Sequence, residues 1–202
     1  MEILRQQFLR HIGQTSPSPM LVEVARAEGV CFFTPEGKRY YDIIAGVSVS
    51  NVGHGNPAVT EAVCRQARDY MHVMVYGELV ERPQVRYAAR IAEYLPAPLD
   101  AVYFVNSGAE AVEGALKLAK RFTGRRRMVA CRNAYHGSTH GAMSVMESRE
   151  FSDATARCCP VWIGYGSTNR RIWVGLPKRR PACSWSPCRA RRGCGFRRRG
   201  IW

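Results

Sequence analysis

The segment VNSGAEAVEGALKLAK (residues 105–120) combines the residue types of an anion-binding turn. A short apolar run ends at Asn106, and Ser107, Gly108 and Ala109 lead straight into an amphipathic helical pattern. The first N–H groups of a helix lack intrahelical partners and lie at the positive end of the helix dipole. Glycine permits close approach of a phosphate, serine adds a hydroxyl donor, and alanine adds an amide without bulk. The segment predicts a phosphate cradle, and the alternative is an ordinary helix start capped by serine or asparagine.

A second cluster, NAYHGSTHGAMS (residues 133–144), gathers an aromatic ring, two histidines and two glycines. It follows a predicted strand, and ligands of open α/β sheets bind at the edge where the strands end. Tyr135 can stack on a planar ring, and His136 can hydrogen-bond beside it. The alternative, which the spacing alone favours, is a core tyrosine next to a histidine that stabilises the loop.

The elements that must position both clusters follow the order of a parallel α/β sheet. Apolar runs at 101–105 and 128–131 predict buried strands, and a helical pattern lies between them. On that helix Glu113 and Lys117 are expected to face the solvent. Its apolar stripe consists of Val112, Ala115, Leu116 and Ala119. Strand, helix and strand at this spacing predict parallel pairing.

The N-terminal third contains shorter elements. Residues 3–12 predict an amphipathic helix, and the β-branched and aromatic runs 30–33 and 39–44 predict a hairpin around TPEGK. The glycine-rich segment 46–57 predicts repeated backbone turns. Two amphipathic helices are expected next, one from Ala58 to Tyr70 and one from Val85 to Leu95.

Residues 157–202 differ in composition from the rest of the chain. Residues 1–156 carry 18 Lys and Arg against 16 Asp and Glu, whereas the last segment carries 12 basic residues and no acid, so it holds most of the net charge of +14. It also contains five of the eight cysteines and all four tryptophans. We interpret this change, near residue 155, as translation out of frame.

Two other interpretations of this tail are weaker. Arginines with interspersed aromatics can bind nucleic acid, but here they show no periodic face. Cys183, Cys188 and Cys194 lack a paired two-residue spacing, and we expect no metal site. Before the tail, three scattered cysteines are typical of reduced thiols. No segment has the apolar run of a signal peptide or a membrane span, so we expect a cytoplasmic protein with no membrane association.

Three segments in order resemble the signatures of class III aminotransferases, the family of ornithine and acetylornithine aminotransferases. They are YYDIIAGVSVSNVGHGNPAVTEAV, YFVNSGAEAVEGALKLAKRFTGR and AYHGSTHGAMSVM, and the resemblance covers about Met20 to Ala154. It implies the α/β fold of a fold-type I pyridoxal-phosphate-dependent transferase, truncated within its large domain, and usually a homodimer. Together with the change in composition near residue 155, it divides the chain into an N-terminal segment with a hairpin (1–57), a partial large domain (58–156) and a basic tail that we do not expect to fold (157–202).

The resemblance assigns roles residue by residue. Ser107, Gly108 and Ala109 match the phosphate-binding turn of pyridoxal 5'-phosphate, Tyr135 matches the aromatic that stacks on the cofactor ring, and His136 lies beside it. The implied reaction transfers an amino group from an ω-amino or N-acylated diamino acid to a 2-oxo acid.

Two further positions concern the substrate. By resemblance Val47 lies near the substrate entrance. Ser138 stands where the acetylornithine subgroup commonly carries an arginine that pairs with the substrate carboxylate. Serine cannot replace the charged guanidinium group of arginine, so the exact amino donor is not specified by these residues.

Catalysis in this family also requires a Schiff-base lysine and an acidic partner for the pyridine nitrogen. In the family both lie beyond the matched segments. The four lysines of this chain are Lys38, Lys117, Lys120 and Lys178, and none matches the catalytic position. We therefore expect an inactive fragment with no catalytic residue. The alternative function is that of a non-catalytic binding protein whose basic tail associates with nucleic acid.

Overall fold

The computed structural model describes residues 2–74, 77–126, 128–131 and 134–146, and the backbone of two short strands further on. The chain divides into two compact units, unit 1 (Met1–Glu81) and unit 2 (Arg82–Trp202), and each is described by itself. The predictions about reading frame, nucleic acid and cysteine ligands concern the tail, of which only the backbone of these two strands is described. The proposed boundaries of its three segments stay predictions.

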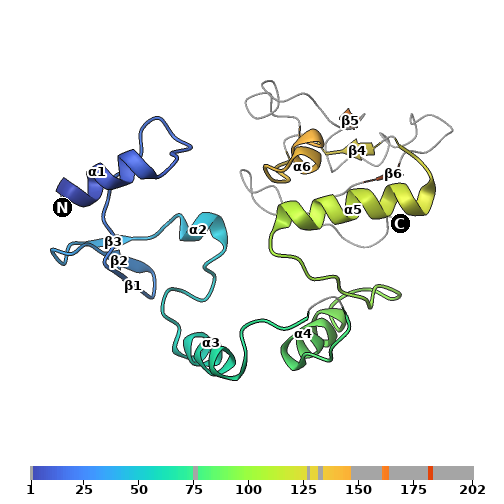
Figure 1. Ribbon diagram of the computed structural model, residues 1–202, viewed down its shortest axis with the longest axis horizontal. Coiled ribbons are helices and arrows are strands. Elements are labelled where there is room, and N and C mark those ends of the chain that lie inside the picture. Colours follow the sequence, from blue (N-terminus) through green and yellow to red (C-terminus); the bar gives the residue numbers. More distant parts are fainter. Residues whose placement is uncertain are drawn as a thin grey trace. The chain divides into compact units, whose positions relative to one another are not determined.

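Unit 1 contains an antiparallel meander of three strands, β1 (Arg26–Glu28), β2 (Cys31–Phe33) and β3 (Arg39–Tyr41), as Figure 1 shows. Phe32 lies opposite Tyr40, and their rings stack with centroids 5.2 Å apart. The predicted hairpin is confirmed as β2 and β3. Sequence-based prediction missed β1, because three residues of sequence RAE carry no alternating apolar pattern.

The glycine-rich segment after β3 begins with a left-handed turn, α2 (Ala45–Ser48). All four residues have positive φ, from 47° to 65°, a conformation that is sterically unfavourable for L-residues. Asp42 supports the turn, because its Oδ1 accepts from the Ile44 and Ala45 N–H groups at 3.2 and 2.8 Å. Its Oδ2 lies 2.7 Å from Nε2 of His54. The expectation of repeated turns here is confirmed.

Three predicted amphipathic helices are present, α1 (Glu2–His11), α3 (Pro57–Asp69) and α4 (Arg82–Ala92). Much of each apolar stripe is exposed, although Ala88 and Ala92 on α4 are partly buried. Val63 on α3 is 61% exposed and Val85 on α4 is 52% exposed. The periodic pattern therefore predicted these helices correctly. An apolar stripe usually packs against a core, but here it is largely exposed.

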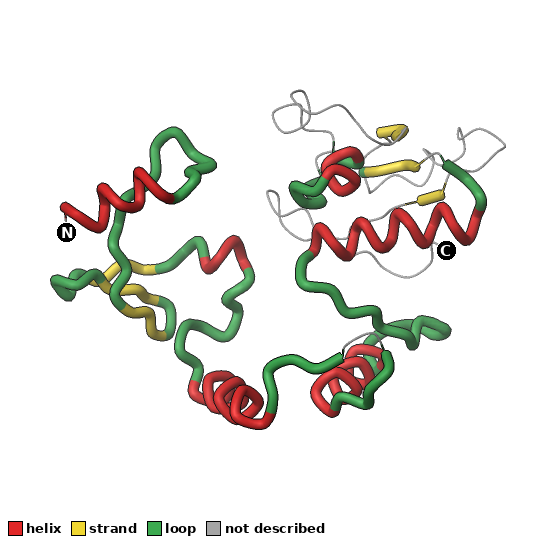
Figure 2. The backbone as a smooth tube through the Cα atoms, in the orientation of Figure 1, coloured by secondary structure: helices red, strands yellow, loops and turns green. Residues whose placement is uncertain are grey.

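Unit 2 is built around α5 (Gly108–Thr123), which packs against β4 (Met128–Ala130) and α6 (His140–Ser144), as Figures 1 and 2 show. Strands β5 (Val161–Ile163) and β6 (Ala182–Cys183) pair with β4 on either side, both in parallel. A parallel sheet that contains the predicted strand at 128–131 is therefore present, but its strands are not the predicted pair, because β4 pairs with β5 and β6 and not with residues 101–105. The core consists of Leu116, Met128, Ala130 and Val145, with Val112 and Ala119 packed against it. Of the predicted stripe, Ala115 alone is exposed.

The predicted strand at 101–105 is wrong, because this segment lies in a loop. Tyr103 is 83% exposed, and Phe104 and Val105 are each 37% exposed. An apolar run becomes a strand only where another strand offers an edge. Both edges of β4 are taken by β5 and β6, so this sheet has no edge next to β4 for the segment.

Candidate functional site

The predicted phosphate turn is the N-terminus of α5. Ser107 is the N-cap, with extended backbone, and its Oγ accepts from the Glu110 N–H at 3.2 Å. The Glu110 carboxylate accepts from the Asn106 N–H at 2.6 Å. Ser107 therefore caps the helix, as the alternative interpretation of this segment predicted. Within the described part of the chain, no hydrogen bond occupies the amides of Gly108 and Ala109, so the turn keeps two outward donors.

The loop after β4 lies directly against this turn. Gly137 has a φ of +115°, and a Cβ at this position would lie 2.5 Å from the Cβ of Ala109 and 2.9 Å from its Cα. Real Cβ atoms do not approach that closely, and the positive φ also favours glycine. The two segments that sequence-based prediction singled out are therefore brought together at one place.

Tyr135 stands on this loop between two buried residues, Ala134 and His136. Its side chain is 46% exposed, and its hydroxyl lies 3.2 Å from Oγ of Ser138, which is itself exposed. The ring is therefore partly accessible to solvent at the surface of the loop. The core-tyrosine alternative therefore does not describe this residue.

His136 is 4% exposed, and neither ring nitrogen has a hydrogen-bond partner among the described residues. Burial lowers the pKa of His136, so the ring is neutral at pH 7 and offers one donor and one acceptor. Buried polar groups are nearly always paired. The two ring nitrogens are therefore candidates for contact with a group outside the described residues.

Glu113 belongs to the same site, although sequence-based prediction placed it on the solvent face. Its Oε1 accepts from Oγ1 of Thr139 at 2.6 Å and from the N–H groups of Gly141 and Ala142 at 2.8 and 3.1 Å. The helical pattern could not reveal this, because these donors lie 26 to 29 positions along the chain. The signal in the sequence was a glutamate on the border of an apolar stripe.

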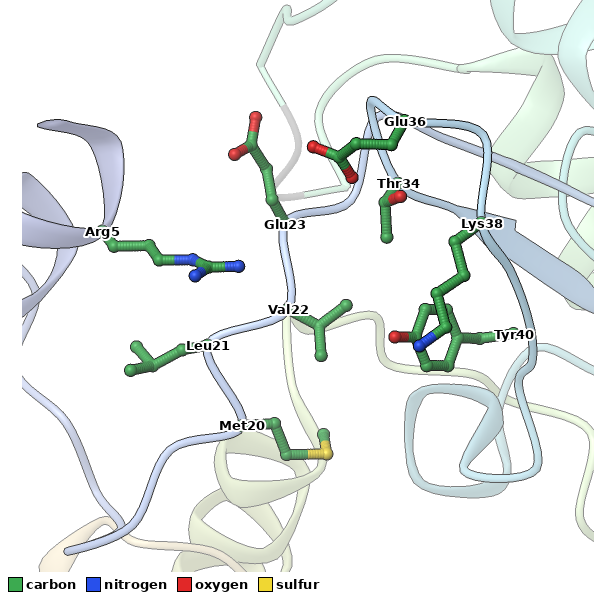
Figure 3. Close-up of a pocket in the computed structure, with 9 residues that line it drawn as sticks. All are labelled: Arg5, Met20, Leu21, Val22, Glu23, Thr34, Glu36, Lys38 and Tyr40. Atoms are coloured by element: carbon green, nitrogen blue, oxygen red, sulfur yellow. The ribbon is translucent and has the colours of Figure 1, made fainter. Parts of the chain in front are cut away.

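Unit 1 holds a cavity of about 380 Å³, shown in Figure 3. Its charged lining is balanced, with the side chains of Arg5 and Lys38 beside those of Glu23 and Glu36. The remaining lining residues are Met20, Leu21, Val22, Thr34 and Tyr40. None of the residues with a predicted role lies in it, and it has no predominant charge to select an anion. The candidate site is therefore the one at α5.

Other predicted residues stand apart from this site. Val47 lies on α2 in unit 1 and is 67% exposed, and its substrate role stays a prediction. Lys117 and Lys120 lie in the C-terminal half of α5, away from its first turn. Among the described residues no cluster of three or more His, Cys, Asp or Glu side chains could hold a metal ion. No described helix is long and apolar enough to cross a membrane.

Comparison with known proteins identifies relatives of this chain. Residues 12–164 match the family described as aminotransferase class-III. The acetylornithine aminotransferase of Methanopyrus kandleri is 38% identical over 163 residues, which are 79% of this chain and 40% of that protein. The chain thus spans about two fifths of the length of this curated relative.

Solved structures that share the fold include two aminotransferases that are 27% identical to this chain. The taurine:2-oxoglutarate aminotransferase of Bifidobacterium kashiwanohense, in complex with PLP and glutamate, matches with a TM-score of 0.68 and 27% identity over 81% of this chain and 38% of its own. The ornithine aminotransferase of Toxoplasma gondii ME49 matches with a TM-score of 0.68 and 27% identity, over 80% of this chain and 39% of its own.

Proposed function

Because the chain belongs to the class-III aminotransferase family, we propose that unit 2 holds pyridoxal 5'-phosphate between the N-terminus of α5 and the loop after β4. Ser107, Gly108 and Ala109 bind the phosphate, as a helix N-terminus does. Tyr135 stacks on the ring, with His136 beside it. The fold expected for such a protein, the α/β fold of fold-type I transferases, is that of its solved relatives.

The observation that carries this proposal is the contact of Gly137 with Ala109, because it joins the anion cradle to the aromatic loop. Three further features fit the cofactor. A Cβ built on Gly108 would meet no atom within 4 Å, so a phosphate can approach the backbone there. The Tyr135 side chain is exposed. The ring nitrogens of the buried His136 have no hydrogen-bond partner among the described residues.

When bound, pyridoxal phosphate supplies the electron sink that lets an amino group pass from an amino acid to a 2-oxo acid. We propose an ω-amino or N-acylated diamino acid as donor, in line with the relative from M. kandleri. Ser138 contributes a neutral hydroxyl beside Tyr135 and no charge for a substrate carboxylate. Following the family, we further propose a cytoplasmic homodimer.

For the 202 residues taken alone, we propose cofactor binding without turnover. Transamination needs a lysine that would hold the cofactor covalently and would carry a proton during the reaction. Lys117 and Lys120 lie along α5 beyond its first turn, and Lys38 belongs to the hairpin of unit 1. No lysine of the chain matches the catalytic lysine of the family.

The test is a titration of the purified chain with pyridoxal phosphate, followed by absorbance, with borohydride trapping and mass spectrometry to locate any modified lysine. We expect saturable binding without a specific lysine adduct. Tyr135→Ala should weaken binding, and Tyr94→Ala, which removes an exposed tyrosine in the same unit, should not. Absence of saturable binding would refute the cofactor site, and a stoichiometric adduct on one lysine would contradict the absence of a catalytic lysine, on which the lack of turnover rests.

A further inference from the structure

The short helix α6 takes its N-terminal cap from another helix. Its own N-cap residue, Thr139, makes no side-chain bond to the first turn of α6. The Thr139 hydroxyl donates instead to Glu113 of α5, and the same carboxylate oxygen accepts from the Gly141 and Ala142 N–H groups. A carboxylate at a helix N-terminus satisfies free N–H groups and interacts favourably with the helix dipole.

Gly141 lies close against this carboxylate. A Cβ on Gly141 would lie 2.2 Å from Oε2 of Glu113 and 2.8 Å from its Cδ. A shift of the Glu113 carboxylate away from such a Cβ would disturb the hydrogen bonds that its Oε1 accepts from Thr139, Gly141 and Ala142. The position of the Glu113 carboxylate therefore requires a residue without a side chain at position 141.

The position of Glu113 links this cap to the proposed cofactor site. Ala109 and Glu113 are four residues apart and lie on one face of α5. Ala109 contacts Gly137, and Glu113 binds Thr139 and the start of α6. The loop that carries Tyr135 and His136 is thus held against α5 at two successive turns.

We propose that Glu113 is a positioning residue of the cofactor site, whose carboxylate fixes the Tyr135–Ser138 loop against the phosphate turn through α6. This inference rests on the proposed function, because the loop matters only if it contacts the cofactor. The hydrogen bond from Thr139, with those from Ala142 and Gly141, lowers the pKa of Glu113, so the carboxylate is charged at neutral pH.

The test is a double-mutant cycle in the full chain, with Glu113→Ala, Gly141→Ala and the double variant. Glu113→Ala should weaken pyridoxal phosphate binding by roughly tenfold or more and speed hydrogen exchange at the 134–142 amides. Gly141→Ala should do the same, because it displaces the carboxylate. In the Glu113→Ala background, however, the added methyl meets no carboxylate, and alanine favours a helix. Gly141→Ala should there cause no further loss.

The induced circular dichroism of bound pyridoxal phosphate gives a second readout, because it reports how the ring is oriented. Its band should diminish in both single variants at saturating cofactor. Glu61→Ala, which removes an exposed carboxylate of α3 that pairs with Arg65 at 3.5 Å, should leave affinity and band unchanged.

The outcomes separate this inference from the proposed function. If the unaltered chain shows no saturable binding, the proposed function is refuted and the inference with it. If the unaltered chain binds and Glu113→Ala binds equally well with the same band, only the positioning role is refuted. Additive losses in the double variant would also contradict it. Non-additive losses, together with faster exchange at 134–142, would support it.

Discussion

The two units each use one carboxylate to hold a turn, but over different ranges of sequence. In unit 1, Asp42 binds the Ile44 and Ala45 amides and reaches His54, 12 positions away. In unit 2, Glu113 binds donors 26 to 29 positions away, on another helix. The first is a local support for a strained turn, whereas the second ties two elements of a core together. Loss of a local support should loosen one segment, and loss of a long-range tie should disturb a whole site.

The largest expected effect is that of Gly137→Ala, which strikes the long-range contact directly. The new Cβ would clash with Ala109 at a positive φ, and we expect unit 2 to lose about 3 kcal/mol of unfolding free energy. Urea denaturation measures the loss. Gly124→Ala is the matched control, because Gly124 also has a positive φ but no atom within 4 Å of an added Cβ. It should cost about 1 kcal/mol. Equal costs would contradict the contact.

Ser107→Ala should have a smaller effect, because it removes a helix cap but no contact between elements. We expect unit 2 to lose about 1 kcal/mol of unfolding free energy, since the Glu110 N–H loses its acceptor. Thermal denaturation measures it. Ser107→Asn preserves capping and should retain stability. A loss as large as that of Gly137→Ala would mean that the turn, and not the loop packed on it, holds the site together.

Asp42→Ala tests the local support in unit 1. We expect faster hydrogen exchange at residues 44–54, because the left-handed turn loses both its backbone contacts and its tie to His54. Exchange in α5 and β4 should stay as it was. Glu28→Ala, which removes an exposed carboxylate that pairs with Arg26 at 2.9 Å, serves as control. Faster exchange in unit 2 as well would contradict the view that Asp42 acts only on its own segment.

The smallest effect concerns pH. The hydrogen bond from Thr139 lowers the pKa of Glu113 below its ordinary value of 4.5. A carboxyl group with a depressed folded pKa contributes stability that is fully present above the unfolded value and is lost as pH falls through the folded one. We expect a modest loss of unit 2 stability as pH falls below about 4.5, and a flatter profile for Glu113→Gln. Parallel profiles for the two proteins would contradict this account.

Much of the local structure was predictable from sequence. The hairpin, four amphipathic helices and the parallel strand β4 follow from periodicity and turn residues, which act over a few positions. The predicted strand at 101–105 is absent, because strand formation depends on a distant partner strand and not on local residues alone. For the site, residue types alone indicated the cradle at Ser107–Ala109 and the loop at Tyr135 and His136.

The amino-acid sequence by itself determined the family, the helix start at Ser107–Ala109 and the aromatic loop, since a short contiguous segment specifies each of them. Only the tertiary structure decided that Gly137 meets Ala109, that Glu113 caps α6 and that His136 is buried without a partner among the described residues. These contacts join residues more than twenty positions apart. They depend on how α5 packs against β4 and α6, which no local pattern of residue types specifies.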